Sequence, residues 1–173
     1  MNKFILIILA LLSIIYVVNK NDSVKIPDSA IRFRILANSN SPKDQKIKEE
    51  VRNKLQKRLY TLLKHTKTIK SAREKINENI NVIKDSLDNE MKDKQYSYTI
   101  DYGMHYFPKK TYKGITYKEG NYESLLVTLG EGNGDNWWCV LFPPMCVMEA
   151  EEKNISNVQY KSFIKEIISR YFE

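Results

Sequence analysis

The side chains best suited to nucleophilic catalysis are few in this chain. It contains two cysteines, Cys139 and Cys146, and two histidines, His65 and His105. A cysteine nucleophile needs a base such as histidine beside it, and nothing in the spacing brings either histidine to a cysteine. We therefore predict no catalytic residue and a protein that is not an enzyme. The alternative is an exported cysteine hydrolase that uses Cys139, or a cell-wall-binding protein.

The two cysteines have a second possible chemistry, which is a disulfide. A Pro-Pro turn lies between Cys139 and Cys146 and could bring them within bonding distance, and export from the cytosol would permit the bond. A domain of about 140 residues does not need such a cross-link for stability. Two reduced, buried thiols therefore stand as the alternative.

Just before the first cysteine, the stretch Gly130–Asp135 alternates glycine with Glu, Asn and Asp. Glycine leaves the backbone free to adopt positive φ. The stretch lacks the Gly-Lys-Ser/Thr end of a phosphate-binding P-loop. It also lacks the later glycine and the distal glutamate of a calcium loop. We expect a tight connection between two strands, with no metal ion and no cofactor.

The strand predicted after this loop begins with two tryptophans. Residues 137–142 suit a buried strand, and Pro143-Pro144 ends it because proline donates no hydrogen bond to a sheet. Trp137 and Trp138 are adjacent, so they point to opposite faces of the strand. One is enough to anchor a core, and tryptophan is enriched among interface hot spots. The predicted partner-binding residues are Gly130, Glu131, Gly132, Gly134, Asp135, Asn136, Trp137 and Trp138. The alternative is that both tryptophans are buried, one under the helices and one under the N-terminal linker or the last helix.

Alternating apolar positions predict the other strands. Residues 31–37 alternate apolar and basic side chains, and residues 96–106 place Tyr, Ile or Met at every second position. Residues 122–129 form the strand before the glycine loop, and residues 111–118 suggest one short edge strand. We expect Tyr98 and Ile100 to be buried beneath helices.

Helical patterns account for most of the rest. Ser41-Pro42-Lys43-Asp44 begins a helix with a capping serine, an early proline and an acid at the third position. Two long apolar stripes follow, the second over residues 68–92, and a third lies near the end of the chain, over residues 160–171. The sequence predicts an α+β fold, a mainly antiparallel sheet with two long helices and a C-terminal helix packed on it.

The first 20 residues differ from the remainder of the chain. Residues 4–18 are almost wholly apolar and follow a single lysine, as in an export signal. The stretch is short for a membrane span, which needs about 20 residues, and no clear cleavage site follows it. We therefore expect residues 1–20 to be a signal peptide or a membrane anchor, and a buried N-terminal helix is the alternative. Residues 21–30 form a linker and residues 31–173 a single domain.

The net charge of +7 is concentrated in the helical part. Residues 42–94 carry 15 Lys and Arg against 9 Asp and Glu. The signs are mixed along both helices, which is typical of a solvated face. A basic surface can attract nucleic acid or anionic lipid, but no nucleic-acid-binding motif is present. We expect membrane contact through residues 4–18, no nucleic-acid partner and no small-molecule substrate.

Three stretches together resemble a known family. They are Gly130–Cys146, which reads GEGNGDNWWCVLFPPMC, then Ile31–Ser39 followed by Ser41-Pro42, and Phe107-Pro108 with the downstream Gly120–Leu125. The combination of Asn-Trp-Trp-Cys with Phe-Pro-Pro uses rare residues and is therefore specific. The chain resembles the stage II sporulation protein R family, from about residue 31 to residue 146 and on into the last helix.

The resemblance implies a signalling role in endospore formation. Members of that family are made in the forespore and exported across its membrane into the intermembrane space. From there they trigger a membrane-embedded aspartic protease of the mother cell, which cleaves the inactive precursor of the sigma factor sigma-E. The resemblance implies a binding and activating protein with that protease as its partner.

Overall fold

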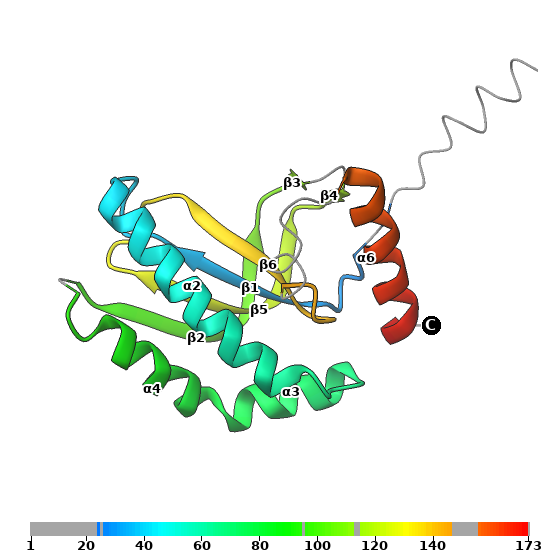
Figure 1. Ribbon diagram of the computed structural model, residues 1–173, viewed down its shortest axis with the longest axis horizontal. Coiled ribbons are helices and arrows are strands. Elements are labelled where there is room, and N and C mark those ends of the chain that lie inside the picture. The colour runs from blue at the N-terminus through cyan, green and yellow to red at the C-terminus, as the bar shows by residue number, and fades with distance from the viewer. Residues whose placement is uncertain (1–23, 25, 95, 113–114, 147–155, 173) are drawn as a thin grey trace, which may run out of the picture.

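The computed structural model describes residues 24, 26–94, 96–112, 115–146 and 156–172. Its elements in chain order are β1 (Ile31–Leu36), α2 (Pro42–Leu63), α3 (Ile69–Glu78), α4 (Ile80–Met91), β2 (Tyr98–Phe107), β3 (Lys110–Tyr112), β4 (Ile115–Tyr117), β5 (Gly120–Leu129), β6 (Asn136–Phe142) and α6 (Asn157–Phe172). The predicted α+β class is confirmed (Figure 1). The predicted signal or anchor, residues 1–20, lies outside the described residues. In the part that is described, we find no helix with the length and apolar character needed to span a membrane.

Four strands form the main sheet in the order β2-β5-β1-β6. The pairs β2–β5 and β1–β6 are antiparallel, so the sheet is mainly antiparallel, as predicted. The central pair, β1–β5, is parallel. Parallel neighbours need a long connection between them, and here α2, α3, α4, β2, β3 and β4 lie between β1 and β5 in the chain. The chain therefore leaves β1, builds the helical layer and the β2 edge, and returns beside β1.

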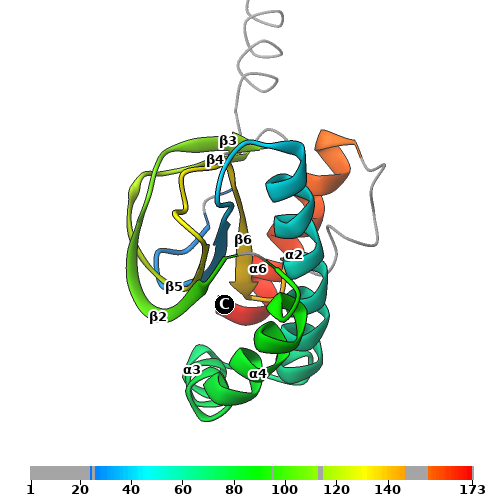
Figure 2. The ribbon, with the colours of Figure 1, turned by 90° about the vertical axis from the view of Figure 1, so that its left-hand side faces the viewer.

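Helices α2 and α4 cover one face of this sheet (Figure 2). Alternate residues of β1 supply its centre, since Ile31, Phe33 and Ile35 are fully buried under the helices. The apolar stripe of α2 packs on them through Val51 and Leu55, among others. The helix begins where the sequence predicts, because the Ser41 side chain accepts a hydrogen bond from the Asp44 backbone N–H at 3.1 Å.

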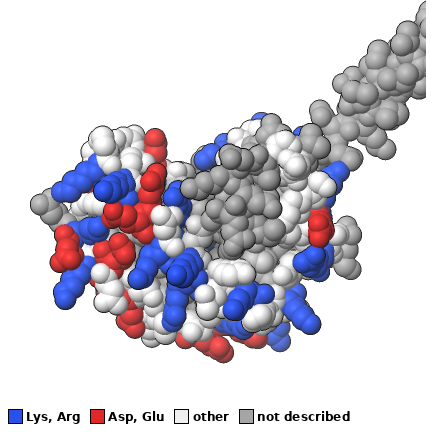
Figure 3. Space-filling view, viewed as in Figure 1, with Lys and Arg blue, Asp and Glu red and all other residues white. Residues whose placement is uncertain are grey.

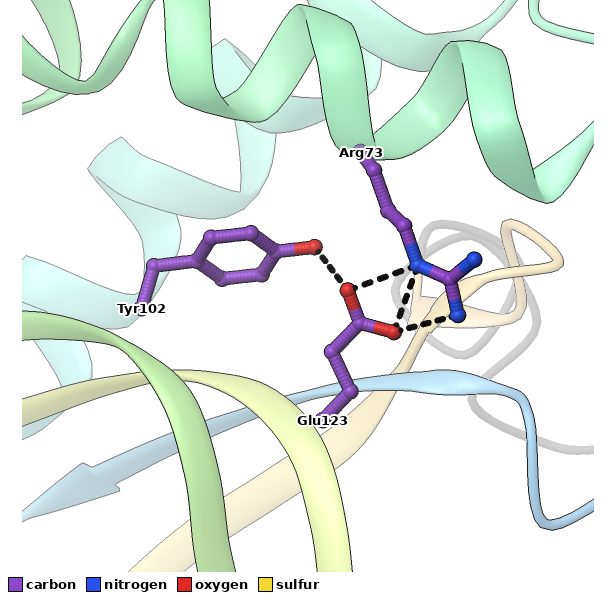
Figure 4. A network of polar contacts seen from close by, with 3 residues as sticks. All are labelled: Arg73, Tyr102 and Glu123. Carbon is purple, nitrogen blue, oxygen red and sulfur yellow. Dashed lines mark hydrogen bonds and ion pairs between the residues drawn. The ribbon is translucent and has the colours of Figure 1, made fainter.

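A polar network attaches α3 to the same face (Figure 4). Arg73 of α3 donates from Nε to both carboxylate oxygens of Glu123 on β5, at 2.9 and 2.8 Å. Tyr102 of β2 donates its hydroxyl to the same carboxylate at 2.6 Å. One acidic side chain therefore connects a helix and two strands.

The other face of the sheet carries a smaller core near β6. It is formed by the β3–β4 hairpin, α6 and the segment before β1, and its members include Ile115, Tyr117, Val140, Tyr160 and Ile164. The C-terminal helix thus packs against β6 and the hairpin, and its Tyr171 also reaches the main core, where its ring meets Phe142 edge-on at 5.2 Å between centroids.

Two predicted elements differ from the structure. The single long helix over residues 68–92 is two helices, α3 and α4, divided at Asn79, whose φ of −107° and ψ of 9° are not helical. Its side-chain Nδ2 donates to the Lys75 carbonyl at 2.9 Å, a local hydrogen bond that competes with the helical pattern. The short edge strand over residues 111–118 is a hairpin, in which β3 pairs with β4. Residues 113–114, within that predicted strand, lie outside the described residues.

The burial predicted for Tyr98 and Ile100 is wrong in degree. Both side chains pack against the helical core, but they are only half-buried. The reason is the position of β2 at the edge of the sheet, where no strand of the described residues pairs along its outer side. Farther along β2, Met104 and Tyr106 are 66% and 56% exposed.

Candidate partner-binding site

The glycine loop joins β5 to β6 and is held by its own backbone. Gly130 and Gly132 adopt positive φ, at 54° and 67°, a region that favours glycine. A side chain at Gly130 would also collide with the side-chain amide of Asn38. Glycine at this position therefore allows the loop to lie directly on the β1–α2 connection, residues 37–41.

Every backbone N–H from residue 130 to residue 135 donates a hydrogen bond within the protein. The acceptors are Ser97 O, Asn38 Oδ1, Leu129 O, Asn38 O, Ala37 O and Asn40 Oδ1, in chain order. A phosphate-binding loop needs N–H groups that point outward, free for the ligand. This loop instead uses all six N–H groups to attach itself to its surroundings, and mainly to residues 37–40.

The β1–α2 connection is itself fixed by Asp44, in the first turn of α2. Asn38 Nδ2 and Ser39 Oγ donate to Asp44 Oδ2 at 2.8 and 2.6 Å. These hydrogen bonds hold the pKa of the Asp44 carboxyl below its usual value, with Ser39 contributing most. Helix α2 thus holds the glycine loop indirectly, because its Asp44 binds Asn38 and Asn38 binds the loop.

Asn38, Asn40 and Asp44 were not among the predicted site residues, although they position the predicted loop. The repeated Asn-Ser pattern of residues 38–41 indicates side chains that bind backbone groups, because short polar residues do so in turns. That pattern does not say which distant loop they bind.

The two tryptophans point to opposite faces of β6, as predicted, and both are half-buried. On the helical face, the Trp137 ring meets the Phe33 ring edge-on at 5.6 Å between centroids. The guanidinium of Arg52, on α2, lies 5.8 Å from the centroid of the Trp137 ring. Trp137 therefore borders the main core and remains within reach of a surface cation.

On the opposite face, Trp138 belongs to an aromatic cluster. Its ring lies edge-on to Tyr117 at 4.7 Å and to Phe107 at 5.6 Å. The ammonium group of Lys110, on β3, is 5.7 Å from the Trp138 ring centroid. Each tryptophan thus has a cation over it, one from α2 and one from the hairpin.

Arg32 of β1 lies inside this aromatic cluster and is only 1% exposed. Its guanidinium stacks at 3.3 Å from the centroid of the Tyr122 ring and 5.0 Å from that of Phe107. Burial lowers the pKa of Arg32. Aromatic rings can stabilise a desolvated guanidinium, so the cluster contains a buried cation and Trp138 forms part of its wall, with 5.4 Å between the guanidinium and the ring centroid.

A disulfide links the middle of β6 to the turn that follows the strand. Cys139 and Cys146 are bonded, with their Cα atoms 5.4 Å apart, and both residues are buried. The bond holds the Pro-Pro turn against the strand that carries the tryptophans.

The family model described as Stage II sporulation protein R matches residues 27–152. The chain is 38% identical to the Stage II sporulation protein R of Bacillus subtilis (strain 168) over 164 residues, which covers 88% of this chain and 73% of the relative. The chain belongs to the stage II sporulation protein R family. No solved structure matches it.

Membership of the stage II sporulation protein R family establishes a role in sporulation. The matched region contains the sheet, the helical layer, the glycine loop, both tryptophans and both cysteines, and it ends before α6. The family name is that of a sporulation protein and not of an enzyme.

The side chains that a cysteine hydrolase would need are engaged elsewhere. The Cys139 sulfur is bonded to Cys146, so it is not a free thiolate. His105 shares hydrogen bonds with Ser124 Oγ at 2.8 Å and with Asp101 Oδ2 at 2.9 Å. His65 is exposed just after the end of α2. Neither histidine forms the Cys–His pair of the hydrolase alternative.

Proposed function

We propose that this protein is an exported sporulation signal that binds and activates a membrane-embedded aspartic protease of the mother cell, and so leads to proteolytic maturation of the sigma-E precursor. Membership of the stage II sporulation protein R family supports this function. The observation that carries the proposed site is the tryptophan pair, because two large, half-buried rings with a cation over each lie beside one surface cavity. Such anchors carry much of the binding energy at protein interfaces.

The binding surface in this proposal runs from Gly130 to Trp138. Glu131, Asn133 and Asp135 are exposed along the loop, while the backbone beneath them is fixed by the β1–α2 connection. A loop that is already rigid in the free protein loses less conformational entropy when it binds a partner. The loop is therefore suited to presenting a fixed shape to the protease.

Export is part of the same proposal. The apolar residues 4–18 would direct the protein out of the forespore into the intermembrane space, and they would anchor it if they are not removed. Disulfides persist outside the reducing cytosol, and the Cys139–Cys146 bond supports such a location. A variant without residues 1–18 should retain its far-ultraviolet circular dichroism and lose signalling. Signalling by that variant from the compartment where it is made would contradict the export step.

The test of the binding surface is a pair of variants, Trp137→Ala and Trp138→Ala. Folding is measured by circular dichroism, and activation by the fraction of sigma-E precursor that is cleaved in sporulating cells. We expect at least one variant to fold and to activate poorly. Tyr106→Ala is the matched control, since Tyr106 is an exposed aromatic side chain on β2, the opposite edge strand of the sheet. If both tryptophan variants fold and activate normally, this surface is not the activating one.

A further inference from the structure

Strand β6 is an edge strand. It pairs with β1 along one side, and no strand in the described part of the chain pairs along its other side. The outer edge of such a strand carries backbone N–H and C=O groups that are available to another chain.

A cavity of about 300 Å³ lies at this edge and is lined by five consecutive residues, 136–140. Consecutive side chains of a strand point to alternate faces, so a cavity over one face would touch only every second residue. Contact with all five means that the cavity follows the edge itself and reaches both faces. At about 3.3 Å per residue, this edge is roughly 16 Å long, the length of a short strand.

The charges around the cavity are basic. Arg52 lines it from α2 and Lys110 from β3, and within the described ranges neither side chain forms an ion pair with a carboxylate. Lys48 lies close by and donates to the Asp135 carbonyl at 2.9 Å. Burial lowers the pKa of Lys48 most, Asp135 and Glu49 oppose this shift, and Arg52 and Lys110 add to it by smaller amounts. The two cations that line the cavity, Arg52 and Lys110, have no carboxylate partner among the described residues and would be stabilised by an anionic partner.

Other basic side chains of the protein are distributed differently. Over the helices in the view of Figure 3, Lys and Arg are interspersed with Asp and Glu, and several are paired, as Lys94 is with Glu50 at 2.7 Å. The two cations beside the tryptophans differ because they flank the outer edge of β6 and have no such carboxylate partner among the residues that the structure describes.

We propose that β6 binds its partner by strand addition: an extended, acidic peptide segment of the partner pairs with the outer edge at residues 136–139, which no described strand occupies, with its carboxylates beside Arg52 and Lys110. Main-chain hydrogen bonds would hold the segment, and the cations would select its side chains. Alternate residues of the added strand would lie beside Trp137 on one face and Trp138 on the other. This inference rests on the proposed function and specifies which part of the partner the site recognises.

The first test measures charge selection. Full-length protein in detergent micelles is titrated into capped, fluorescein-labelled octapeptides that alternate Glu with Val or Thr, and binding is followed by fluorescence anisotropy. We expect the acidic peptides to bind and their Lys counterparts not to bind. Arg52→Glu and Lys110→Glu should each weaken binding about tenfold, because like charges would then face each other. Arg58→Glu on the same helix and Lys109→Glu beside Lys110 are the matched controls and should have little effect.

The second test is specific to strand addition. In an edge strand only every second N–H points toward the neighbouring strand. Two versions of the best acidic peptide are therefore compared, with N-methyl groups on the odd or on the even residues. We expect one set to abolish binding and the other to be tolerated. Strand addition is overturned if both sets bind equally well. It is also overturned if no acidic peptide has a dissociation constant below about 1 mM, which corresponds to a binding free energy of about −4 kcal/mol.

A single-stranded nucleic acid is the rival occupant of a basic, aromatic groove. An eight-residue oligothymidylate serves as its probe in the same assay, and binding of this probe more tightly than any acidic peptide would overturn the inference.

The peptide assays and the activation assay separate the two proposals. If Trp137→Ala or Trp138→Ala abolishes activation while no acidic peptide binds, the activator function stands and strand addition fails. If acidic peptides bind with the expected N-methyl pattern while both tryptophan variants activate normally, strand addition stands and the activating surface lies elsewhere.

Discussion

Asp44 determines the position of the candidate site although it does not belong to the site's surface. It accepts hydrogen bonds from Asn38 and Ser39, and Asn38 in turn binds two N–H groups of the glycine loop, those of Glu131 and Asn133. The carboxylate lies at the start of α2, where a negative charge is also favoured by the helix dipole. A single buried carboxylate thus connects the helical layer to the loop before the tryptophans.

The substitution Asp44→Asn should lower the thermal midpoint and change its dependence on pH. The hydrogen bonds from Ser39 and Asn38 lower the pKa of Asp44 in the folded protein. Its stabilisation is therefore complete above the ordinary aspartate pKa of about 4 and is lost as the pH falls through the lower value of the folded state. The variant should lose stability at pH 7 and show a shallower loss as the pH falls below about 4.

The matched control for Asp44→Asn is Glu49→Gln, an exposed position on the same helix. Thermal unfolding of both variants is followed by circular dichroism across that pH range. An Asp44→Asn protein with the wild-type midpoint at pH 7 would show that this carboxylate does not hold the connection.

At the scale of elements, the half-burial of β2 determines how much a charge introduced on this strand should lower the free energy of unfolding. Ile100 lies on the side that meets the helices and is paired across the strands with Val127. Thr99, its neighbour, is exposed on the other face. The two positions share a strand and differ in environment, so they form a matched pair.

Ile100→Asp should destabilise the domain by about 2 kcal/mol, because an unpaired charge would enter a partly apolar contact. Thr99→Asp should change the free energy of unfolding by less than about 0.5 kcal/mol. Urea unfolding of both proteins measures the difference. Equal stabilities would mean that the side of β2 facing the helices is assigned wrongly.

Helix α3 is attached by the apolar packing of Ala72 and Ile76 in the main core and by the polar network around Glu123 of β5. Burial and the hydrogen bond to Glu123 raise the pKa of Tyr102 well above its usual value, so its hydroxyl remains a donor at neutral pH. Glu123→Gln should destabilise the protein by about 1 kcal/mol, since the ion pair with Arg73 is partly exposed and screened.

Glu74→Gln, at an exposed position of α3, is the control for Glu123→Gln. Hydrogen exchange provides the local readout, because α3 amides should exchange faster in the Glu123 variant than in the control. Unchanged exchange in α3 would show that apolar packing alone holds this helix.

At the scale of the whole molecule, we expect the disulfide to contribute to the stability of the fold and not to its activity. It closes a loop in which the two cysteines are seven residues apart, and a loop of that size is expected to contribute roughly 2 kcal/mol. The double variant Cys139→Ser with Cys146→Ser should therefore unfold at lower urea concentration while it still activates precursor cleavage. A thiol enzyme would instead lose all activity with Cys139.

Reduction of the wild-type protein with a thiol reagent is the control for this double variant. Reduced wild-type protein and the variant should have the same free energy of unfolding. If the variant folds but does not activate at all, the activity depends on Cys139 itself or on the bonded turn, and the simple binding role fails.

Local chemistry in the sequence was enough to determine several features of this protein. Ser41, Pro42 and Asp44 define a helix start within four residues, because capping depends only on neighbouring backbone groups. The adjacency of Trp137 and Trp138 already requires opposite faces, since side chains alternate along any strand. The same stretch, with its cysteines and prolines, was specific enough to indicate the family.

Tertiary structure decided what depends on partners distant in the chain. The half-burial of Ile100 follows from the position of β2 in the sheet, and alternation alone does not say that β2 and β6 are the edge strands. The sequence predicts a tight connection over Gly130–Asp135 but not its partners, and the fold engages all six of its N–H groups, chiefly with residues 37–40. The cations over the tryptophans come from α2 and β3, which no local pattern connects to β6. Local preferences act through neighbouring backbone groups, and this site is formed by segments up to about a hundred residues apart, which only packing of the whole domain brings together.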